Sequence, residues 1–428
     1  MQRLQRSQID TYVARRRITD VDTSNDVATI VEDVRRRGEQ AVREHSERFG
    51  DIASGEPIVA LPEDLEAASL RVGGETLDLL TRTSGRIELF AQAQRDALSD
   101  ISIDVDGGQA GHRWTPIATA GAYAPGGRYP LPSSVLMTVV PARVAGVSSI
   151  WLASPRATDV TLAAAHVAGA DACVLAGGAQ AIAALAFGVF GPRCDMVVGP
   201  GNRWVTAAKK HLFGEIGIEG LAGPSEILVL ADQSADAELV AADLLAQAEH
   251  DDDAVPMLVT TSEQLADEVE RQMAIQVAWL STADTARAAC SNGFIYVASS
   301  RSEAIEISDE VAPEHLAIHM ADADAVLSDA TSFGSAFVGR ASAEAFADYG
   351  AGPNHVLPTA GGARFQAGLS PMSFLRASTW LRLDEPDRLI ADTSALAELE
   401  GLDAHKRAAL LRTGQGSVGD QSRLTAMS

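Results

Sequence analysis

The stretch SIWLASPRATDVTLAAAHVAGADACVLAGGAQAIAALAF, residues 149–187, decides the fold class. Two short apolar runs, Ser149–Ala153 and Ala172–Ala176, each precede an alanine-rich segment, Val160–Ala168 and Ala179–Phe187. Short apolar runs are typical of strands buried on both faces, and the longer segments between them are typical of helices. This alternation predicts a parallel α/β sheet.

The same alternation continues on both sides of this stretch. Further strands are predicted at Ile117–Ala122, Met196–Val198 and Ile227–Ala231, with helices at Ser133–Ala145 and Trp204–Phe213. A second series follows a predicted helix at Ala237–His250, and its strand candidates are Pro256–Thr261, Phe294–Ala298, Leu316–Met320 and Ser335–Val338. The sequence therefore predicts an α/β protein with two doubly wound, Rossmann-like parallel sheets.

Helical extensions are predicted before and after the two sheets. Apolar residues at helical spacing indicate helices over 26–49 and roughly 62–98. From about residue 373 we expect helices followed by a loose polar tail, TGQGSVGDQSRLTAMS. The predicted domains are residues 1–110 joined to 225–372 as one discontinuous domain, residues 111–224 as a second, and residues 373–428 as a helical C-terminal region.

Composition argues against several classes of function. The 428 residues are too many for one ordinary core, and the net charge of -24 repels nucleic acids and anionic membranes. Three widely spaced cysteines, Cys173, Cys194 and Cys290, provide neither a disulfide framework nor a thiolate zinc site. We expect a cytoplasmic protein, because the sequence has no signal-like N-terminus and no apolar run approaching about 18 residues.

Glycine-rich turns follow several of the predicted strands: GAYAPGGRYP at 121–130, AGGAQA at 176–181 and GPGNRW at 199–204. Such turns let backbone amides approach a phosphate at the positive end of a helix, at the sheet edge where ligands bind. None of these three turns completes a GxGxxG motif: Gly199 and Gly201 begin one, but Trp204 occupies the third glycine position. The turns are consistent with nucleotide binding, and a purely structural role for each of them stays open.

Four short contexts pair a histidine with an amide or an acid: Gln247 with His250, Glu314 with His315, Asp348 with His355, and Glu400 with His405. Gln247 and His250 share one face of a predicted helix. Asp348 and His355 flank a glycine-rich loop that can fold back on itself. The adjacent Glu314 and His315 point to opposite sides of an extended segment, which suits two different proton-transfer roles. Together these groups could bind zinc or manganese. The alternative is that each is a separately satisfied core or surface group.

Nine blocks of sequence, in this order, resemble the histidinol dehydrogenase family over residues 20–412: GAYAPGG, PSSVLMT, GGAQAIAAL, GPGN, AGPSEILVLAD, ADLLAQAEHD, APEHL, DYGAGPNHVLPT and EGLDAH. The resemblance implies a zinc-dependent, NAD-linked enzyme that oxidises L-histidinol through L-histidinal to L-histidine, the last steps of histidine biosynthesis. It also implies an intertwined homodimer in which His405 of the partner subunit completes the zinc site.

The resemblance also implies roles for individual residues. The implied zinc ligands are Gln247, His250, Asp348 and His405. In the implied catalytic pair, His315 is the general base for the alcohol and Glu314 activates water in the second half-reaction. The implied substrate contacts are Ser225, Gln247, His250, Glu314, His315, Asp348, His355, Glu400 and His405. The implied NAD contacts are Tyr123, Gln180 and Asn202.

Two residues depart from the family pattern, Trp204 after GPGN and His319 after EHL. Related enzymes with the same ligands and Glu–His pair oxidise other polyols, including a sulfonated diol. A paralogous dehydrogenase of another small amino alcohol or diol is therefore the alternative function. An anionic substrate would require an extra cation, for which Arg128 and Arg203 are candidates, whereas Glu400 favours a cationic amine. A non-catalytic scaffold is disfavoured, because no ligand or acid–base residue is missing.

Overall fold

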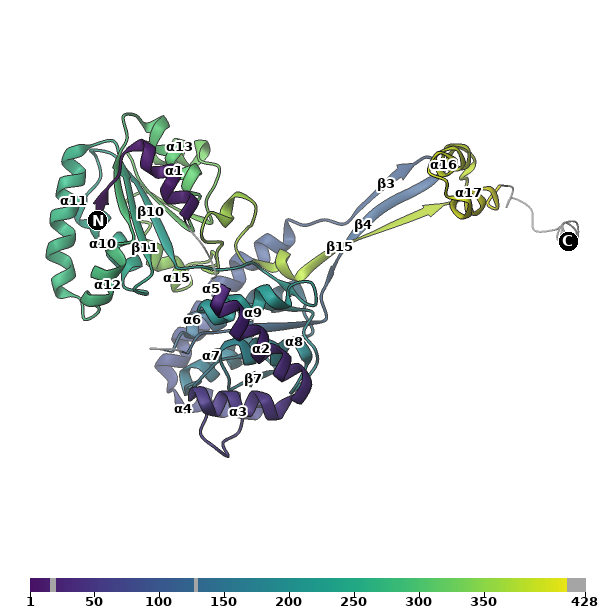
Figure 1. Ribbon diagram of the computed structural model, residues 1–428, viewed down its shortest axis with the longest axis horizontal. Coiled ribbons are helices and arrows are strands. Elements are labelled where there is room, and N and C mark those ends of the chain that lie inside the picture. The colour runs from purple at the N-terminus through teal and green to yellow at the C-terminus, as the bar shows by residue number, and fades with distance from the viewer. Residues whose placement is uncertain (16–20, 127–129, 414–428) are drawn as a thin grey trace, which may run out of the picture. The chain divides into compact units, whose positions relative to one another are not determined.

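The computed structural model describes residues 1–15, 21–126 and 130–413, so Arg128 and the predicted tail beyond Thr413 lie outside the described residues. The chain forms two compact units, residues 1–96 with 116–374, and residues 97–115 with 375 onward. The first unit contains two mainly parallel sheets flanked by helices, which confirms the predicted α/β class (Figure 1). Among the described residues, no helix is long and apolar enough to cross a membrane.

One six-stranded parallel sheet is built mainly from the second half of the chain, in the order β1-β12-β11-β10-β13-β14. Its strands are β1 (Gln2–Arg3), β10 (Glu226–Ala231), β11 (Val255–Thr260), β12 (Phe294–Val297), β13 (His315–His319) and β14 (Ser335–Val338). Its helices are α1 (Arg6–Arg15), α10 (Ala237–Ala248), α11 (Glu263–Gln276), α12 (Ala283–Cys290), α13 (Arg301–Val311), α14 (Ala323–Asp329) and α15 (Glu344–Asp348). Strands β10 and β13 are buried throughout, as expected for central parallel strands.

The other six-stranded sheet has the order β2-β7-β6-β5-β8-β9. Its strands are β2 (Val59–Ala60), β5 (Thr119–Tyr123), β6 (Ser149–Ala153), β7 (Ala172–Val174), β8 (Met196–Val198) and β9 (Gly217–Ile218). All pair in parallel except β2, which pairs antiparallel with β7 at the edge. The connecting helices are α6 (Pro132–Ala145), α7 (Asp159–Ala168), α8 (Gly178–Phe187) and α9 (Arg203–Leu212), close to the predicted segments.

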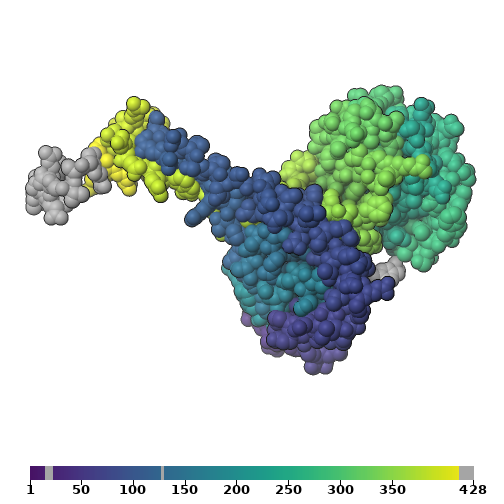
Figure 2. Space-filling view, turned by 180° about the vertical axis from the view of Figure 1, so that it is seen from behind, coloured from purple at the N-terminus to yellow at the C-terminus, as the bar shows by residue number. Residues whose placement is uncertain are grey.

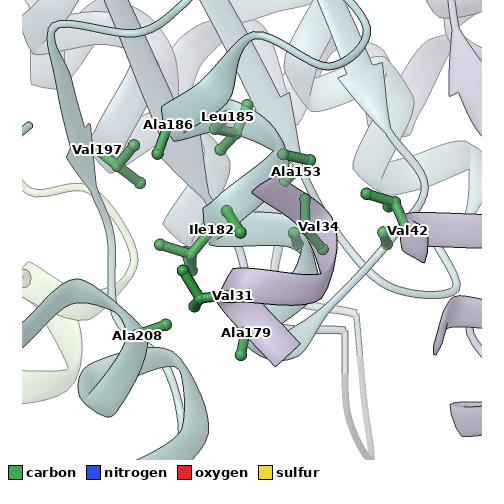
Figure 3. Packing of buried hydrophobic residues seen from close by; sticks show 14 of the residues in the cluster. Val31, Val34, Val42, Ala153, Ala179, Ile182, Leu185, Ala186, Val197 and Ala208 are labelled. Atoms are coloured by element: carbon green, nitrogen blue, oxygen red, sulfur yellow. The ribbon is translucent and has the colours of Figure 1, made fainter. Parts of the chain in front are cut away.

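The N-terminal helices pack differently from the expectation. Only β1 and α1 join the sheet formed by residues 226–338, whereas helices α2 (Val21–Arg37), α3 (Glu39–Phe49), α4 (Pro62–Arg71) and α5 (Gly74–Asp96) pack against helices α6 to α9. Val31 and Val34 of α2 share a core with Ile182 and Ala208, as Figure 3 shows. Helical spacing identifies the apolar face of α2 but carries no information about which sheet receives it.

The second unit is a three-stranded antiparallel sheet with two helices. Its order is β15-β4-β3, with β3 (Ile101–Val105), β4 (Gly108–Pro116) and β15 (Leu375–Leu383), followed by α16 (Asp387–Leu399) and α17 (Asp403–Leu410). Figure 2 shows the blue β3–β4 segment beside the yellow C-terminal segment. The expectation of a helical region from residue 373 therefore misses β15, because this strand is stabilised by pairing with residues far away in the sequence.

Three single turns of 3-10 helix complete the secondary structure, at Val277–Trp279, Gly362–Arg364 and Pro371–Phe374. Two edges of the parallel sheets bring together residues that the sequence predicts to be functional. The amino ends of β10 and β13 lie side by side, since Ile227 is in register with His315. The carboxyl ends of β5, β7 and β8 lie together at one edge of the other sheet. The predicted chemical residues of the first unit fall at these two edges.

Candidate active site

Two buried glutamates begin the neighbouring strands β10 and β13. The backbone N–H of Glu226 donates to Oε2 of Glu314 at 2.9 Å, and the backbone N–H of Glu314 donates to Oε1 of Glu226 at 3.3 Å. The backbone N–H of Ala360 also donates to Oε1 of Glu226, at 3.1 Å. The first two bonds hold the Glu314 carboxyl at the start of β13. The third connects Glu226 to the loop that follows His355.

Burial raises the pKa of Glu314 well above its ordinary value, although the Glu226 N–H bond opposes this shift. The neighbouring carboxylates of Glu226, Glu344 and Asp348 raise the pKa further, because like charges disfavour ionisation. Glu314 is therefore a carboxyl group that holds its proton to higher pH than a solvated glutamate does. Such a group can serve as an acid or, once ionised, as a strong base.

The imidazole of His315 is held on one side by two oxygen atoms. Its Nδ1 lies 3.0 Å from Oε1 of Gln247 and 3.2 Å from Oε1 of Glu344. Because both neighbours are acceptors, the proton of the neutral ring is assigned to Nδ1, and Nε2 becomes the nitrogen that can take a proton. Burial, with the nearby His250 and His355, lowers the pKa of His315 to about 3, so the ring is neutral at physiological pH.

The end of α10 and the short helix α15 bring nitrogen and oxygen ligands together. Gln247 Nε2 lies 3.2 Å from His250 Nδ1, and His250 Nε2 lies 3.6 Å from Oδ2 of Asp348. One ligand atom from each of His250, Glu344 and Asp348 lies within 4.8 Å of the other two. The helix α10 ends at Ala248, so His250 lies just beyond it rather than on it as predicted.

The charges of this cluster fit a divalent cation. Glu344 is buried, its Oε2 has no hydrogen-bond partner among the described residues, and burial together with Asp348 and Asp243 raises its pKa well above the ordinary value. A bound cation would relieve the repulsion between Glu344 and Asp348. Imidazole nitrogen with amide and carboxylate oxygen is a donor set that zinc accepts. The residues present therefore fit the implied metal.

The loop from Asp348 to His355 is fixed by helices α5 and α6. The side chain of Arg86 donates to the carbonyl of Gly350 at 2.9 Å, and Asn354 donates to the carbonyl of Met137 at 2.7 Å. His355 Nδ1 lies 3.1 Å from the Asp348 carbonyl oxygen and 3.8 Å from Oδ1 of Asp348. Burial lowers the pKa of His355, so a second neutral imidazole faces this cluster.

The structure thus gathers most of the predicted site residues at one place in the first unit. Contacts link Glu314, His315, Gln247, His250, Asp348 and His355 into one cluster. Ser225 immediately precedes Glu226 and is half-buried. The remaining two of the predicted zinc and substrate residues, Glu400 and His405, lie in the second unit, where both are exposed, Glu400 at the end of α16 and His405 in α17.

Sequence reasoning missed Glu344 and Glu226, which bond directly to the catalytic candidates. A signal existed for Glu344, because it lies four residues before Asp348 and so shares a helix face with it. The unexpected His319 also has a structural explanation. Its Nε2 lies 2.8 Å from Oδ2 of buried Asp243, so the pair ties β13 to α10 one helical turn away from the contact of His315 with Gln247.

The three predicted coenzyme contacts lie at the carboxyl edge of the other sheet. Tyr123 ends β5, and its hydroxyl accepts the backbone N–H of Gly178 at 3.3 Å. Gln180 follows in α8, and its Nε2 donates to Oδ2 of Asp51 at 3.1 Å. Asn202 begins α9, where its Oδ1 accepts the N–H groups of the next helical turn at 3.0 and 3.3 Å.

The glycine turns at 176–181 and 199–204 do not support the predicted phosphate-binding role. Their backbone N–H groups already donate hydrogen bonds to side chains. The N–H of Gly177 donates to Asp51, and that of Gly178 donates to Tyr123. The N–H of Gly199 donates to Glu219 at 2.6 Å, and a side chain at Gly199 would approach the carbonyl oxygen of Tyr123 to 2.1 Å. These glycines serve close packing and internal capping.

A family model described as histidinol dehydrogenase matches residues 13–413 of the chain. The chain belongs to the histidinol dehydrogenase family. This confirms the resemblance found in the sequence blocks. Membership of the histidinol dehydrogenase family also establishes that the chain is an enzyme, an oxidoreductase.

Curated relatives and a solved structure agree with the family model. The histidinol dehydrogenase of Haloarcula marismortui is 45% identical, over 89% of this chain and 91% of its own length. That of Methanosarcina mazei is 41% identical over 92% of each chain. The crystal structure of histidinol dehydrogenase from Elizabethkingia anophelis has a TM-score of 0.90 and 32% identity, covering 96% of this chain and 97% of that one.

Proposed function

We propose that the enzyme oxidises L-histidinol to L-histidinal and then to L-histidine, the last steps of histidine biosynthesis, with reduction of two NAD. The observation that carries this proposal is the Glu314–His315 pair at the start of β13, next to a cluster of metal-ligating side chains. Two different proton-transfer groups at one place suit two successive oxidations, the first of an alcohol and the second of a hydrated aldehyde.

In the first oxidation, His315 takes the hydroxyl proton of the substrate at Nε2. Gln247 and Glu344 hold Nδ1–H and thereby orient the ring, as the acceptor of a catalytic histidine does. The lowered pKa of His315 keeps the ring neutral before the reaction. Glu344 lies close enough to stabilise the imidazolium that forms, which offsets the low basicity of a buried imidazole.

In the second oxidation, Glu314 in its ionised form takes a proton from the water that attacks the aldehyde carbon. The N–H of Glu226 holds one carboxylate oxygen of Glu314, so the other can face the water. Loss of a hydride from carbon and of a proton from a hydroxyl group then converts the hydrated aldehyde into the carboxylic acid, and NAD, when bound, would accept the hydride. The raised pKa makes Glu314 a strong base whenever it is ionised.

Zinc would be held by Gln247, His250 and Asp348, with His405 of the partner subunit as the fourth ligand, in an intertwined homodimer. When bound, the metal would supply an anchor that orients the substrate through the imidazole and amine of histidinol. NAD would be held by Tyr123, Gln180 and Asn202 and would accept the electron pair. The convergence of His250 and Asp348 supports the zinc assignment.

The surroundings of the site disfavour an anionic substrate. The carboxyl groups of Glu314, Glu344 and Asp348 lie close together, and none of their described contacts is with lysine or arginine. Of the two cations considered for an anionic substrate, Arg203 lies over the ring of Trp204 at the coenzyme edge, and Arg128 lies outside the described residues. An amino alcohol is therefore favoured over a sulfonated diol, the alternative on this scaffold.

The function is tested by incubating zinc-loaded enzyme with L-histidinol and measuring NADH formed per histidinol consumed. We expect two NADH per histidinol, and we expect activity to disappear on chelation and to return with added zinc. One NADH per histidinol would contradict the double oxidation. An absence of turnover by folded, zinc-loaded enzyme would contradict histidinol as the substrate, and a screen of small diols and amino alcohols would then identify the paralogous activity.

The contribution of His405 from the partner subunit is tested by complementation. We expect His405→Ala and His315→Ala chains to be inactive alone and to regain about a quarter of the wild-type activity when exchanged in equal amounts, because about half the chains form mixed dimers with one intact site each. Isotope labelling of one chain would verify subunit exchange by mass spectrometry. No recovery after complete exchange would show that His405 acts within its own chain or not at all.

A further inference from the structure

The carboxylate of Asp51 lies beside two residues of the proposed coenzyme site. Asp51 follows helix α3, and its Oδ2 accepts the backbone N–H of Gly177 at 2.9 Å and the Nε2 of Gln180 at 3.1 Å. The residue is half-buried, whereas Gln180 is fully buried. No glycine turn or metal pattern draws attention to Asp51 in the sequence, because it joins this edge from a segment more than a hundred residues earlier.

Only one oxygen of this carboxylate is used. Both hydrogen bonds of Asp51 end on Oδ2, and Oδ1 accepts none from the described residues. A half-buried carboxylate with one oxygen saturated and one free is able to accept a hydrogen bond from a ligand. The side chain that carries this free oxygen, Asp51, is hydrogen-bonded to Gln180, which is one of the three proposed coenzyme contacts.

Asp51 also places a negative charge at the amino end of helix α8, where the charge is usually positive. The amino end of α8 carries a partial positive charge that would attract a phosphate. Here the first amides of the helix are taken by the Asp51 carboxylate and the Tyr123 hydroxyl, so the position is already occupied by an anion. A second anion, such as a phosphate ester, would meet a carboxylate at close range instead of free N–H groups.

The other charged groups near this edge do not cancel that effect by direct pairing. Arg156, an exposed residue after β6, acts on Asp51 through its charge without an ion pair within 4 Å being formed between them. Lys209 is buried and pairs with Glu219 at 2.7 Å, so it is neutralised. Asp51 is thus the carboxylate in direct contact with Gln180. Burial raises its pKa, whereas the hydrogen bonds from Gly177 and Gln180 and the more distant charge of Arg156 oppose this shift.

We propose that Asp51 determines coenzyme specificity: its free oxygen accepts a hydrogen bond from a ribose hydroxyl of NAD, and its charge excludes NADP, which carries a phosphate on the adenosine ribose. The proposal rests on the proposed NAD site at Tyr123, Gln180 and Asn202. An acidic side chain that reads a ribose hydroxyl is a general solution for distinguishing the two coenzymes, and here it comes from a helix–strand loop outside the parallel sheet.

The test is the replacement Asp51→Asn, which removes the charge while Oδ1 of the new amide can still accept the Gly177 and Gln180 hydrogen bonds. NAD and NADP are titrated separately into zinc-loaded full-length enzyme by calorimetry, without histidinol. We expect the wild type to bind NAD at least about tenfold more tightly than NADP, and the variant to reduce this preference by about tenfold. Asp284→Asn, an exposed residue of α12, is the control for a change of net charge and should keep the wild-type preference.

Two results would overturn the proposal. One is a wild type that binds the two coenzymes equally, and the other is an Asp51→Asn variant, folded by circular dichroism, that keeps the wild-type preference. Asp51→Ser is the second variant, to be used if Asp51→Asn does not fold, and the same reduction is expected. Because binding is measured without histidinol, an enzyme that binds NAD but does not oxidise histidinol contradicts the proposed substrate and leaves the Asp51 test valid.

Discussion

Replacing His315 with Asn is expected to lower kcat for histidinol oxidation by about 10³-fold, the range found when a general base is removed. The amide Nδ2–H of Asn can replace the ring Nδ1–H that faces Gln247 and Glu344, so the buried acceptors keep a donor. What the variant lacks is Nε2, the atom proposed to take the hydroxyl proton. The loss should therefore fall on kcat much more than on KM.

The measurement is steady-state NADH formation with histidinol, together with zinc content and thermal unfolding of the variant. His319→Gln is the matched control, because His319 is also a buried histidine on β13 and bonds to the Asp243 carboxylate through Nε2, which the Nε2–H of Gln can replace. We expect the control to keep kcat within a few-fold of wild type. Equal losses in the two variants would mean that β13 needs buried imidazoles for its structure, and His315 would not be the base.

Replacing Glu314 with Gln is expected to separate the two oxidations. The Gln amide oxygen can still accept the Glu226 N–H, so the strand start should keep its geometry. The amide cannot take a proton from water, and oxidation of the aldehyde should fall by about 10³-fold while oxidation of the alcohol falls far less. Histidinol should then give one NADH, and the aldehyde should accumulate and be trapped by hydroxylamine.

The pH dependence gives a second measurement on the same variant. Burial first, and the neighbouring carboxylates next, raise the pKa of Glu314, so the ionised base forms only as pH rises through that raised value. The rate of aldehyde oxidation by wild type should therefore rise with pH, and this rise should be absent in Glu314→Gln. A wild-type rate that falls as pH rises through the neutral range would contradict Glu314 as the base.

The two parallel sheets could be predicted from the sequence because their signal is local. Short apolar runs such as Ser149–Ala153 and the alanine-rich segments between them specify strand and helix by periodicity alone, and the observed elements lie close to the predicted ones. The strand β15 gave no comparable signal. Six of its nine residues are exposed, so its formation depends on pairing with β4, which is distant in the sequence.

Residue types at the site were also predictable, whereas their partners were not. Spacing and resemblance identified Gln247, His250, Glu314 and His315 as candidates. The contact between Glu344 and His315, and the reciprocal bonds between Glu226 and Glu314, join residues on separate elements. Such contacts depend on strand register and on the packing of α15 against α10, which no local pattern encodes.

The sequence by itself determined the α/β class, the family and the residues that can carry acid–base and metal chemistry. The class follows from local periodicity, and the family and the residues follow from blocks of sequence that resemble the family. Only the tertiary structure decided which sheet receives helices α2 to α5 and which oxygens hold His315. It also brought Asp51 to the edge proposed to bind the coenzyme. The physical reason is that burial, pKa shifts and hydrogen-bond partners arise from groups brought together by packing, over separations that a local sequence pattern does not span.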